Sequence, residues 1–245
     1  TAYIVMDFVE GVTLKTYAEQ HGGKMPAKEV LRLFRPLCDA LARVHDAGLL
    51  HRDISPDNII LRPDGTLTLI DFGAARQISA NGEHSNTVNV KQGFAPEEQY
   101  RTRGEQGPWT DVYALAATIY RLTTGQTPPQ ALDRILNDEP LAPPSALGAA
   151  VTPRQEAALL HGLACRAADR TQTMQAFMEQ LYGEGAESPE AARPLEKYAE
   201  NTISAMEPVP VPAPDEFRES APEETQPQPE ENKPARKANK KAIVI

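Results

Sequence analysis

The stretch His51-Arg52-Asp53-Ile54-Ser55-Pro56-Asp57-Asn58 decides the fold, together with two shorter motifs further along the chain. Asp71-Phe72-Gly73 begins thirteen residues after Asn58, and Ala95-Pro96-Glu97 follows it. Aspartate and asparagine supply the oxygen ligands that a hard cation such as Mg²⁺ prefers. Any one of Asp53, Asn58 and Asp71 would fit an ordinary polar turn. All three at this spacing instead predict a functional site.

Two short β-type runs lie between the first two motifs. Ile59-Ile60-Leu61 and Leu67-Thr68-Leu69-Ile70 flank Pro63-Asp64-Gly65, which is a turn signal. Apolar runs of this length on either side of a turn predict a hairpin. The first motif would precede the hairpin and the second would follow it, so the two motifs would lie at either side of the hairpin.

The rest of the chain up to about Tyr182 has the periodicity of helices. Apolar residues recur at three- and four-residue steps between Pro26 and Gly48, which predicts a long amphipathic helix. A second helix is predicted from about Thr110 to Gly125. Two more are predicted, one opened by Thr152-Pro153 and one over residues 173–182. The expected fold class is therefore mainly α, a helical bundle with one small β-hairpin.

Composition excludes several classes of function. The net charge is −9, and no extended basic stripe precedes the last dozen residues, so we expect no nucleic-acid partner. Cys38 and Cys165 lie far apart in helical patterns, without the close pairs of a zinc site, which indicates buried thiols in a reducing compartment. No run of 18 apolar residues is present, so we expect no complete membrane span. The N-terminus has neither an initiating Met nor a basic region ahead of an apolar one, so we expect no signal peptide.

The composition changes after Gly183. Residues 183–235 are rich in proline and glutamate and lack periodic apolar residues, so we predict a disordered linker. Residues 236–245 turn abruptly from basic to apolar. This pattern fits either the start of a membrane helix near Ile243, with Lys237, Lys240 and Lys241 on its cytoplasmic side, or an ordinary basic tail.

The three motifs resemble the catalytic loop, metal-binding loop and activation-segment end of eukaryotic-type serine/threonine protein kinases, in the form found in bacteria. The resemblance covers residues 1–182 and implies ATP and Mg²⁺ as cofactors, protein substrates, a signalling role and a cytoplasmic location, at the membrane face in the parent protein. Residues 1–11 resemble the last strand of the small lobe running into the hinge. The expected fold is thus the large lobe alone, inactive until a small lobe completes it.

The resemblance also implies a role for individual residues. Asp53 would be the catalytic base, and Asn58 and Asp71 would be the metal ligands. His51, Phe72 and Gly73 complete the motifs, while Asp111 would hold the backbone of the catalytic loop. Arg52 would pair with a phosphate on the activation segment, where the candidate sites are Ser79, Ser85 and Thr87. Arg170 would pair with Glu97. The nucleotide would contact Met6 as gatekeeper, the backbone of Asp7 and Val9, and the side chains of Leu14 and Ile60.

This sequence departs from the family pattern at three positions. Ser55 stands where serine/threonine kinases usually carry a lysine near the transferred phosphate, so one charge partner of the transition state is missing. Residues 90–95 are one residue too short ahead of Ala95-Pro96-Glu97, and Ala116 replaces the usual glycine. Two alternatives stay open: a pseudokinase or docking module, and a small-molecule phosphotransferase of the aminoglycoside or choline kinase type.

Overall fold

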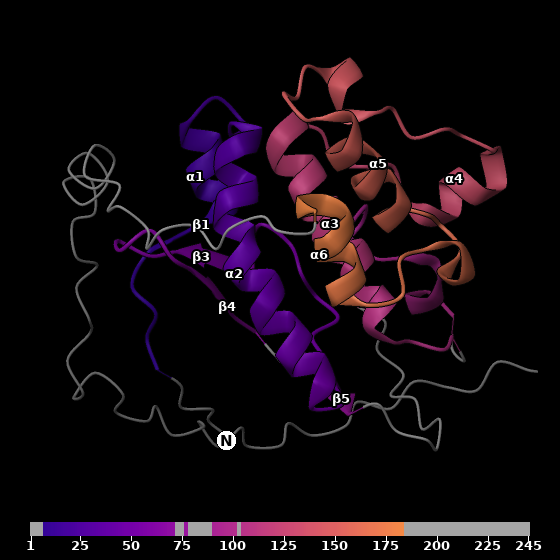
Figure 1. Cartoon of the computed structure of the whole chain (residues 1–245), viewed down its shortest axis with the longest axis horizontal. Coiled ribbons are helices and arrows are strands. Elements are labelled where there is room, and N and C mark those ends of the chain that lie inside the picture. The colour runs from indigo at the N-terminus through magenta and orange to yellow at the C-terminus, as the bar shows by residue number, and fades with distance from the viewer. Residues whose placement is uncertain (1–6, 72–75, 78–89, 102–103, 184–245) are drawn as a thin grey trace, which may run out of the picture. The chain divides into compact units, whose positions relative to one another are not determined.

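Helices dominate the computed structural model, which describes residues 7–71, 76–77, 90–101 and 104–183 (Figure 1). The helices are α1 (Leu14–Gln20), α2 (Ala27–Asp46), α3 (Pro108–Thr124), α4 (Ala131–Asn137), α5 (Pro153–Gly162) and α6 (Met174–Tyr182), with 3₁₀ turns η2 (Glu97–Gln99), η3 (Pro144–Leu147) and η4 (Ala167–Asp169). The strands are β1 (Val12–Thr13), β2 (Leu49–Leu50), β3 (Ile59–Leu61), β4 (Leu67–Leu69) and β5 (Arg76–Gln77). The expected fold class, mainly helical with a small sheet, is confirmed.

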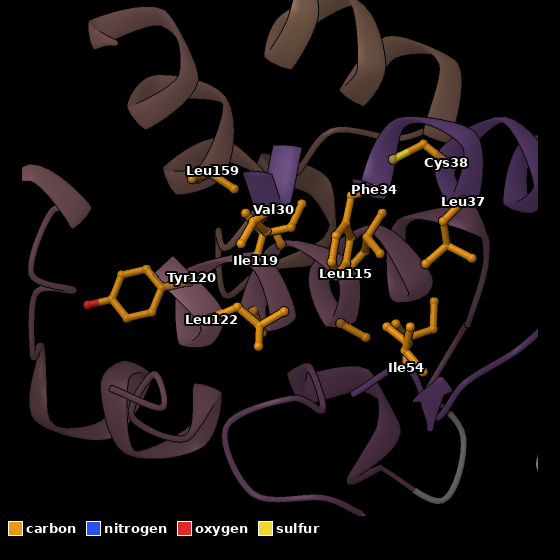
Figure 2. Close-up of a cluster of buried hydrophobic side chains, with 14 of the residues drawn as sticks. Val30, Phe34, Leu37, Cys38, Ile54, Leu115, Ile119, Tyr120, Leu122 and Leu159 are labelled. Carbon is orange, nitrogen blue, oxygen red and sulfur yellow. The ribbon is translucent and has the colours of Figure 1, made fainter. Parts of the chain in front are cut away.

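The helices pack around α2 and α3. Helix α2 contacts α3 and α6, and α5 contacts both α3 and α6 (Figure 1). Val30 and Phe34 on α2 face Leu115 and Ile119 on α3, and all four are fully buried (Figure 2). Most of the stability of a helix in a protein comes from packing of this kind, because its apolar face is then removed from water. This buried apolar seam fixes the position of the first turn of α3, which reaches the site.

A contact between α3 and α5 makes room for Ala116, which replaces the glycine usual in the family. Ala116 is fully buried on α3, and a Cβ added to Gly162 on α5 would lie 2.9 Å from the Ala116 Cβ. The missing side chain at Gly162 therefore makes room for the methyl group at position 116.

The predicted hairpin is present as β3 and β4. The two strands are antiparallel, with Ile59 opposite Leu69 and Leu61 opposite Leu67, and β1 pairs with the other edge of β3. Asp64 stabilises the turn, because its Oδ1 accepts hydrogen bonds from the Thr66 amide at 2.9 Å and the Thr66 hydroxyl at 2.6 Å. At the opposite end, the Ile70 amide donates to the Asn58 carbonyl at 2.9 Å. The hairpin thus brings the first and second motifs together.

The helix boundaries largely follow their sequence signals. Thr152 caps α5 by accepting from the Gln155 amide, with Pro153 in the first turn, and Thr173 caps α6 in the same way. Gly125 ends α3 in the left-handed conformation. Helix α3 begins at Pro108, two residues before the predicted start. Helix α2 ends at Asp46, with Ala47 as its C-cap, just ahead of Gly48.

Several predictions fall outside the described residues. They concern Met6, Phe72 and Gly73, the candidate phosphorylation sites Ser79, Ser85 and Thr87, the linker from residue 184 onward, and the basic segment 236–245. Within the described ranges, no helix is long and apolar enough to cross a membrane. Both cysteines are free thiols, and Cys38 is fully buried, which raises its pKa to about 12. Cys165 is only partly buried.

Candidate active site

The catalytic loop is held by a buried carboxylate, that of Asp111 in the first turn of α3. Its Oδ1 accepts from the Arg52 amide at 2.8 Å, and its Oδ2 accepts from the His51 amide at 2.9 Å. The His45 Nε2 lies 2.8 Å from the same Oδ2. Arg52 has a φ of +72°, a conformation that costs a non-glycine residue energy. The charge-assisted hydrogen bonds that the Asp111 carboxylate accepts offset that cost and keep the loop in one conformation.

His51 joins the loop to the end of β4. Its Nε2 lies 3.1 Å from the Ile70 carbonyl, and its Nδ1 lies 3.3 Å from the Asp53 amide. The amide can only donate and the carbonyl can only accept, so the ring carries its proton on Nε2. Burial lowers the pKa of His51 and outweighs the carboxylates of Asp111, Asp53 and Asp71, which act in the opposite direction. The ring is therefore neutral at pH 7.

Asp53 and Asn58 contact each other directly. The Asn58 Nδ2 donates to the Asp53 carbonyl and to the Asp53 Oδ2, both at 2.8 Å. Both amide hydrogens are thereby used, which fixes the direction of the amide and leaves its Oδ1 for another partner. One Asp53 carboxylate oxygen is oriented by this bond while the side chain remains partly exposed. Such a carboxylate can accept a proton from a hydroxyl that approaches from solvent.

The oxygen donors present fit a Mg²⁺ ion that is shared with phosphates. Asn58 offers its Oδ1, and Asp71 is exposed with a φ of +65° directly after the hairpin. Among the described residues, no group of three or more His, Cys, Asp or Glu side chains could hold a metal ion without other ligands. Mg²⁺ commonly binds one or two carboxylates and takes its remaining ligands from water and substrate phosphates. The donor set is therefore suitable for a nucleotide-bound cation.

Arg170 pairs with Glu98 rather than with Glu97, which corrects the expectation from the motif. The Arg170 Nη1 lies 2.7 Å from the Glu98 Oε1, and both side chains are almost fully buried. The guanidinium also donates to the carbonyls of Ala164, Cys165 and Trp109. Glu97 instead pairs with Arg101, whose side chain is 66% exposed. If Glu98, rather than Glu97, is matched to the glutamate of the family motif, the segment that starts at Val90 has the usual length.

Two side chains that the motifs did not predict also touch the catalytic loop. The Lys91 Nζ donates to the Ser55 Oγ at 2.8 Å and lies 2.7 Å from the Asp57 Oδ2. The Gln99 Nε2 donates to the Arg52 carbonyl at 2.8 Å. Both come from the segment that contains Glu98, and both line a small open pocket with Asp53. The spacing gave no signal for them, because their partners lie 36 and 47 residues away.

The nucleotide contacts expected near residue 10 are only partly available. Asp7 is exposed, Val9 is partly buried and Ile60 on β3 is partly buried, so each retains surface for a ligand. Leu14 is fully buried in the main core, and its assignment to the adenine site is therefore wrong. Its position at the start of α1 turns the side chain away from solvent. Gly11, with a φ of +144°, lets the chain cross β3 close to Ile60.

Comparison with known proteins agrees with this geometry. The family model for the protein kinase domain matches residues 1–146, more than half of the sequence, so the chain belongs to the protein kinase family. The resemblance drawn from the motifs is confirmed.

Individual relatives come from bacteria. Serine/threonine-protein kinase PknB of Mycolicibacterium smegmatis is 29% identical over 239 residues, which cover 86% of this chain and 37% of that protein. Serine/threonine-protein kinase PknL of Mycobacterium tuberculosis is 38% identical over 127 residues, 51% of this chain and 31% of that protein. A solved structure titled PpkA-294 apo form is 36% identical with a TM-score of 0.60, covering 71% of this chain and 61% of that one. The chain thus spans about a third of the length of these curated relatives.

Proposed function

We propose that this chain carries the catalytic loop of a serine/threonine protein kinase, which transfers the γ-phosphoryl group of ATP to a hydroxyl group of a protein. The observation that carries the proposal is the Asp53 carboxylate, oriented by Asn58 at 2.8 Å in a loop that Asp111 anchors. Protein kinases rely on positioning and electrostatic stabilisation rather than on covalent chemistry, and a rigid loop with one oriented carboxylate suits that task.

In the proposed reaction, Asp53 orients the acceptor hydroxyl and takes its proton. The acceptor oxygen forms a bond to the γ-phosphorus as the bond from that phosphorus to the β–γ bridging oxygen breaks. The electron pair of the broken bond stays on the β-phosphate, so ADP leaves. The small pocket beside Asp53, lined by Phe94 and Ala95 among others, is where the acceptor hydroxyl would approach the carboxylate.

Asn58 and Asp71 are the residues proposed to hold Mg²⁺. When bound, the ion would neutralise charge on the phosphates. Asn58 also keeps the Asp53 carboxylate from rotating, since its Nδ2 is bonded to both the carbonyl and the carboxylate of that residue. His51 supports the same geometry through its neutral ring.

The described residues would correspond to the hinge and the large lobe of the kinase. The purine would meet the backbone of Asp7 and Val9 and the side chain of Ile60. The sequence contains no glycine-rich loop, strand lysine or helix glutamate of the family type ahead of the catalytic loop, so the clamp on the β- and γ-phosphates would come from a small lobe elsewhere in the full-length protein. The coverage of the curated relatives is compatible with such a longer protein.

Regulation and location extend the proposal. Arg52 would bind a phosphate on Ser79, Ser85 or Thr87, because a phosphate brings about −1.5 to −2 charges and several acceptors. The basic cluster that ends in Lys240 and Lys241 would lie at the cytoplasmic face of a membrane, since anionic lipids attract each basic residue by about 1 kcal/mol. Phosphopeptide mapping tests the first point. Flotation of a fusion of residues 183–245 with vesicles containing phosphatidylserine tests the second.

The test of the proposed function is the identity of the acceptor. The full-length protein would be incubated with ATP and Mg²⁺ in the presence of protein substrates, aminoglycosides or choline, and the products analysed by mass spectrometry. We expect phosphate on serine or threonine of protein. Phosphorylated small molecules with unmodified protein would contradict the proposal, as would the absence of transfer to any acceptor.

A further inference from the structure

Lys91 brings a positive charge to the catalytic loop from a segment distant in the sequence. Its ammonium group lies 2.8 Å from the Ser55 Oγ and 2.7 Å from the Asp57 Oδ2, and it lines the same pocket as Asp53. Ser55 itself is fully buried, while the Lys91 side chain is 35% exposed. The uncharged Ser55 hydroxyl thus accepts a hydrogen bond from the Lys91 ammonium group, which places a cation next to position 55.

Lys91 shares its one salt-bridge partner among the described residues with a second lysine. Asp57 pairs with both Lys91 and Lys15, at 2.7 and 3.1 Å. One carboxylate therefore faces two ammonium groups. Asp53 contributes a second carboxylate to the pocket, but no salt bridge joins it to either lysine among the described residues.

Lys91 also has capacity for a further ligand. An ammonium group donates three hydrogen bonds. Ser55 and Asp57 take two of them, and the third has no partner among the residues that the structure describes. A ligand that enters the pocket beside Asp53 meets this free donor on a positively charged group. A phosphate group has the matching acceptors and charge.

We propose that Lys91 binds the γ-phosphate of ATP and stabilises the charge on it during transfer. Lys91 would thereby replace the family lysine whose position is occupied by Ser55. The proposal deepens the proposed function and rests on it. In the transfer step, the acceptor oxygen bonds to the γ-phosphorus, the bond to the bridging oxygen breaks with its electrons left on ADP, and the hydroxyl proton goes to Asp53. Lys91 forms and breaks no covalent bond. Its ammonium donates to an oxygen of the phosphoryl group throughout the step.

The experiment uses the full-length protein with three variants. Lys91→Met removes the charge and keeps most of the aliphatic stem. Ser55→Lys/Lys91→Ala moves the charge to the catalytic loop and clears the space that the Lys91 side chain filled. Lys28→Met is the matched control, since Lys28 is exposed on α2. For each protein, the affinities for ADP and for the non-hydrolysable analogue AMP-PNP are measured with Mg²⁺, together with kcat and the melting temperature.

The comparison of AMP-PNP with ADP shows whether Lys91 contacts the γ-phosphate or another part of the nucleotide. Lys91→Met should lower kcat by about 10²-fold, the scale found for removing one donor that stabilises developing charge. It should weaken AMP-PNP binding about tenfold and leave ADP binding within about twofold. The double variant should recover at least about tenfold of the lost kcat, and Lys28→Met should match the wild type.

Equal weakening of ADP and AMP-PNP binding, or unchanged values for both nucleotides and for kcat, would overturn the proposal. If the double variant melts at a lower temperature than the wild type, the ratio of the two affinities in Lys91→Met still decides. A wild-type protein that binds both nucleotides and transfers no phosphate would refute the proposed function instead. In that case, the ratio of the AMP-PNP and ADP affinities in Lys91→Met would still show whether Lys91 binds the γ-phosphate.

Discussion

Single residues determine the shape of the catalytic loop. Asp111 accepts hydrogen bonds from two backbone amides, and Asn58 donates to the backbone carbonyl and to the carboxylate of Asp53. Neutral His51 joins the loop to the hairpin. Each of these contacts is short and at least partly buried, so losing one partner leaves a polar group that water reaches poorly. The loop is therefore stiff before any nucleotide binds, which is what a catalyst based on positioning requires.

Replacing Glu98 and Glu97 separately tests the corrected ion pair. Glu98→Gln should lower the free energy of unfolding by about 3 kcal/mol, because it leaves the buried Arg170 charge without a partner. Glu97→Gln should change it by less than about 1 kcal/mol, because its partner Arg101 is mostly exposed. Urea denaturation of both variants measures the difference. A larger loss in Glu97→Gln would restore the original assignment from the motif.

The neutral state of His51 predicts a dependence of stability on pH. Its pKa is lowered from 6.5 in the folded protein, chiefly by burial. As the pH falls below about 6.5, the unfolded chain therefore takes up a proton that the folded protein does not, and stability decreases until the pH reaches the folded pKa. Urea unfolding at pH 7.5, 6.5 and 5.5 should show a smaller decrease in His51→Gln than in the wild type. Parallel curves would mean that His51 titrates normally in the fold.

Short elements place these residues relative to one another. The hairpin joins Asn58 to Ile70, and the buried seam between α2 and α3 presents Asp111 to the loop. The first strand, β1, follows a glycine that passes over β3. A Cβ on Gly11 would meet the Leu61 carbonyl and would lie 2.6 Å from the Ile60 Cγ2. The close approach of the chain at Gly11 to β3 depends on this missing side chain.

Comparing Gly11→Ala with Gly22→Ala isolates that close approach. Both glycines have positive φ, but Gly22 has no atom within 4 Å of an added Cβ. Gly22→Ala should cost about 1 kcal/mol of stability from conformation alone, and Gly11→Ala should cost about 1–3 kcal/mol more, because the backbone must also move. Chemical denaturation of the two variants gives the comparison. Equal costs would show that the crossing over β3 tolerates a methyl group.

The sequence predicts the elements with strong local signals and misses contacts that depend on distant segments. Turn residues, caps and apolar periodicity predict the hairpin and the helices α2, α3, α5 and α6. Helices α1 and α4 were not predicted, since each has only seven residues and little periodicity. Two adjacent glutamates look alike in sequence, so only packing distinguishes Glu98 from Glu97. Leu14 was misassigned because its spacing from the motifs does not reveal its burial.

At the scale of the whole molecule, the helical core holds one rigid loop at its surface. The described residues bring Asp53 and Asn58 into contact, and the segment from Val90 to Gln99 lies beside them around an open pocket. Family membership and this arrangement both support the proposed phosphoryl transfer. Phe8, at the start of the described residues, is 92% exposed.

The most direct test of this account is the turnover of Asp53→Asn in the full-length protein. Asparagine has nearly the same shape but cannot accept the hydroxyl proton. Turnover should therefore fall by several orders of magnitude, about the scale seen when a central catalytic group is removed, while the affinity for ATP stays close to that of the wild type. Asp39→Asn, on the exposed face of α2, is the control and should behave as the wild type does. An Asp53→Asn enzyme that turns over at the wild-type rate would contradict the central claim.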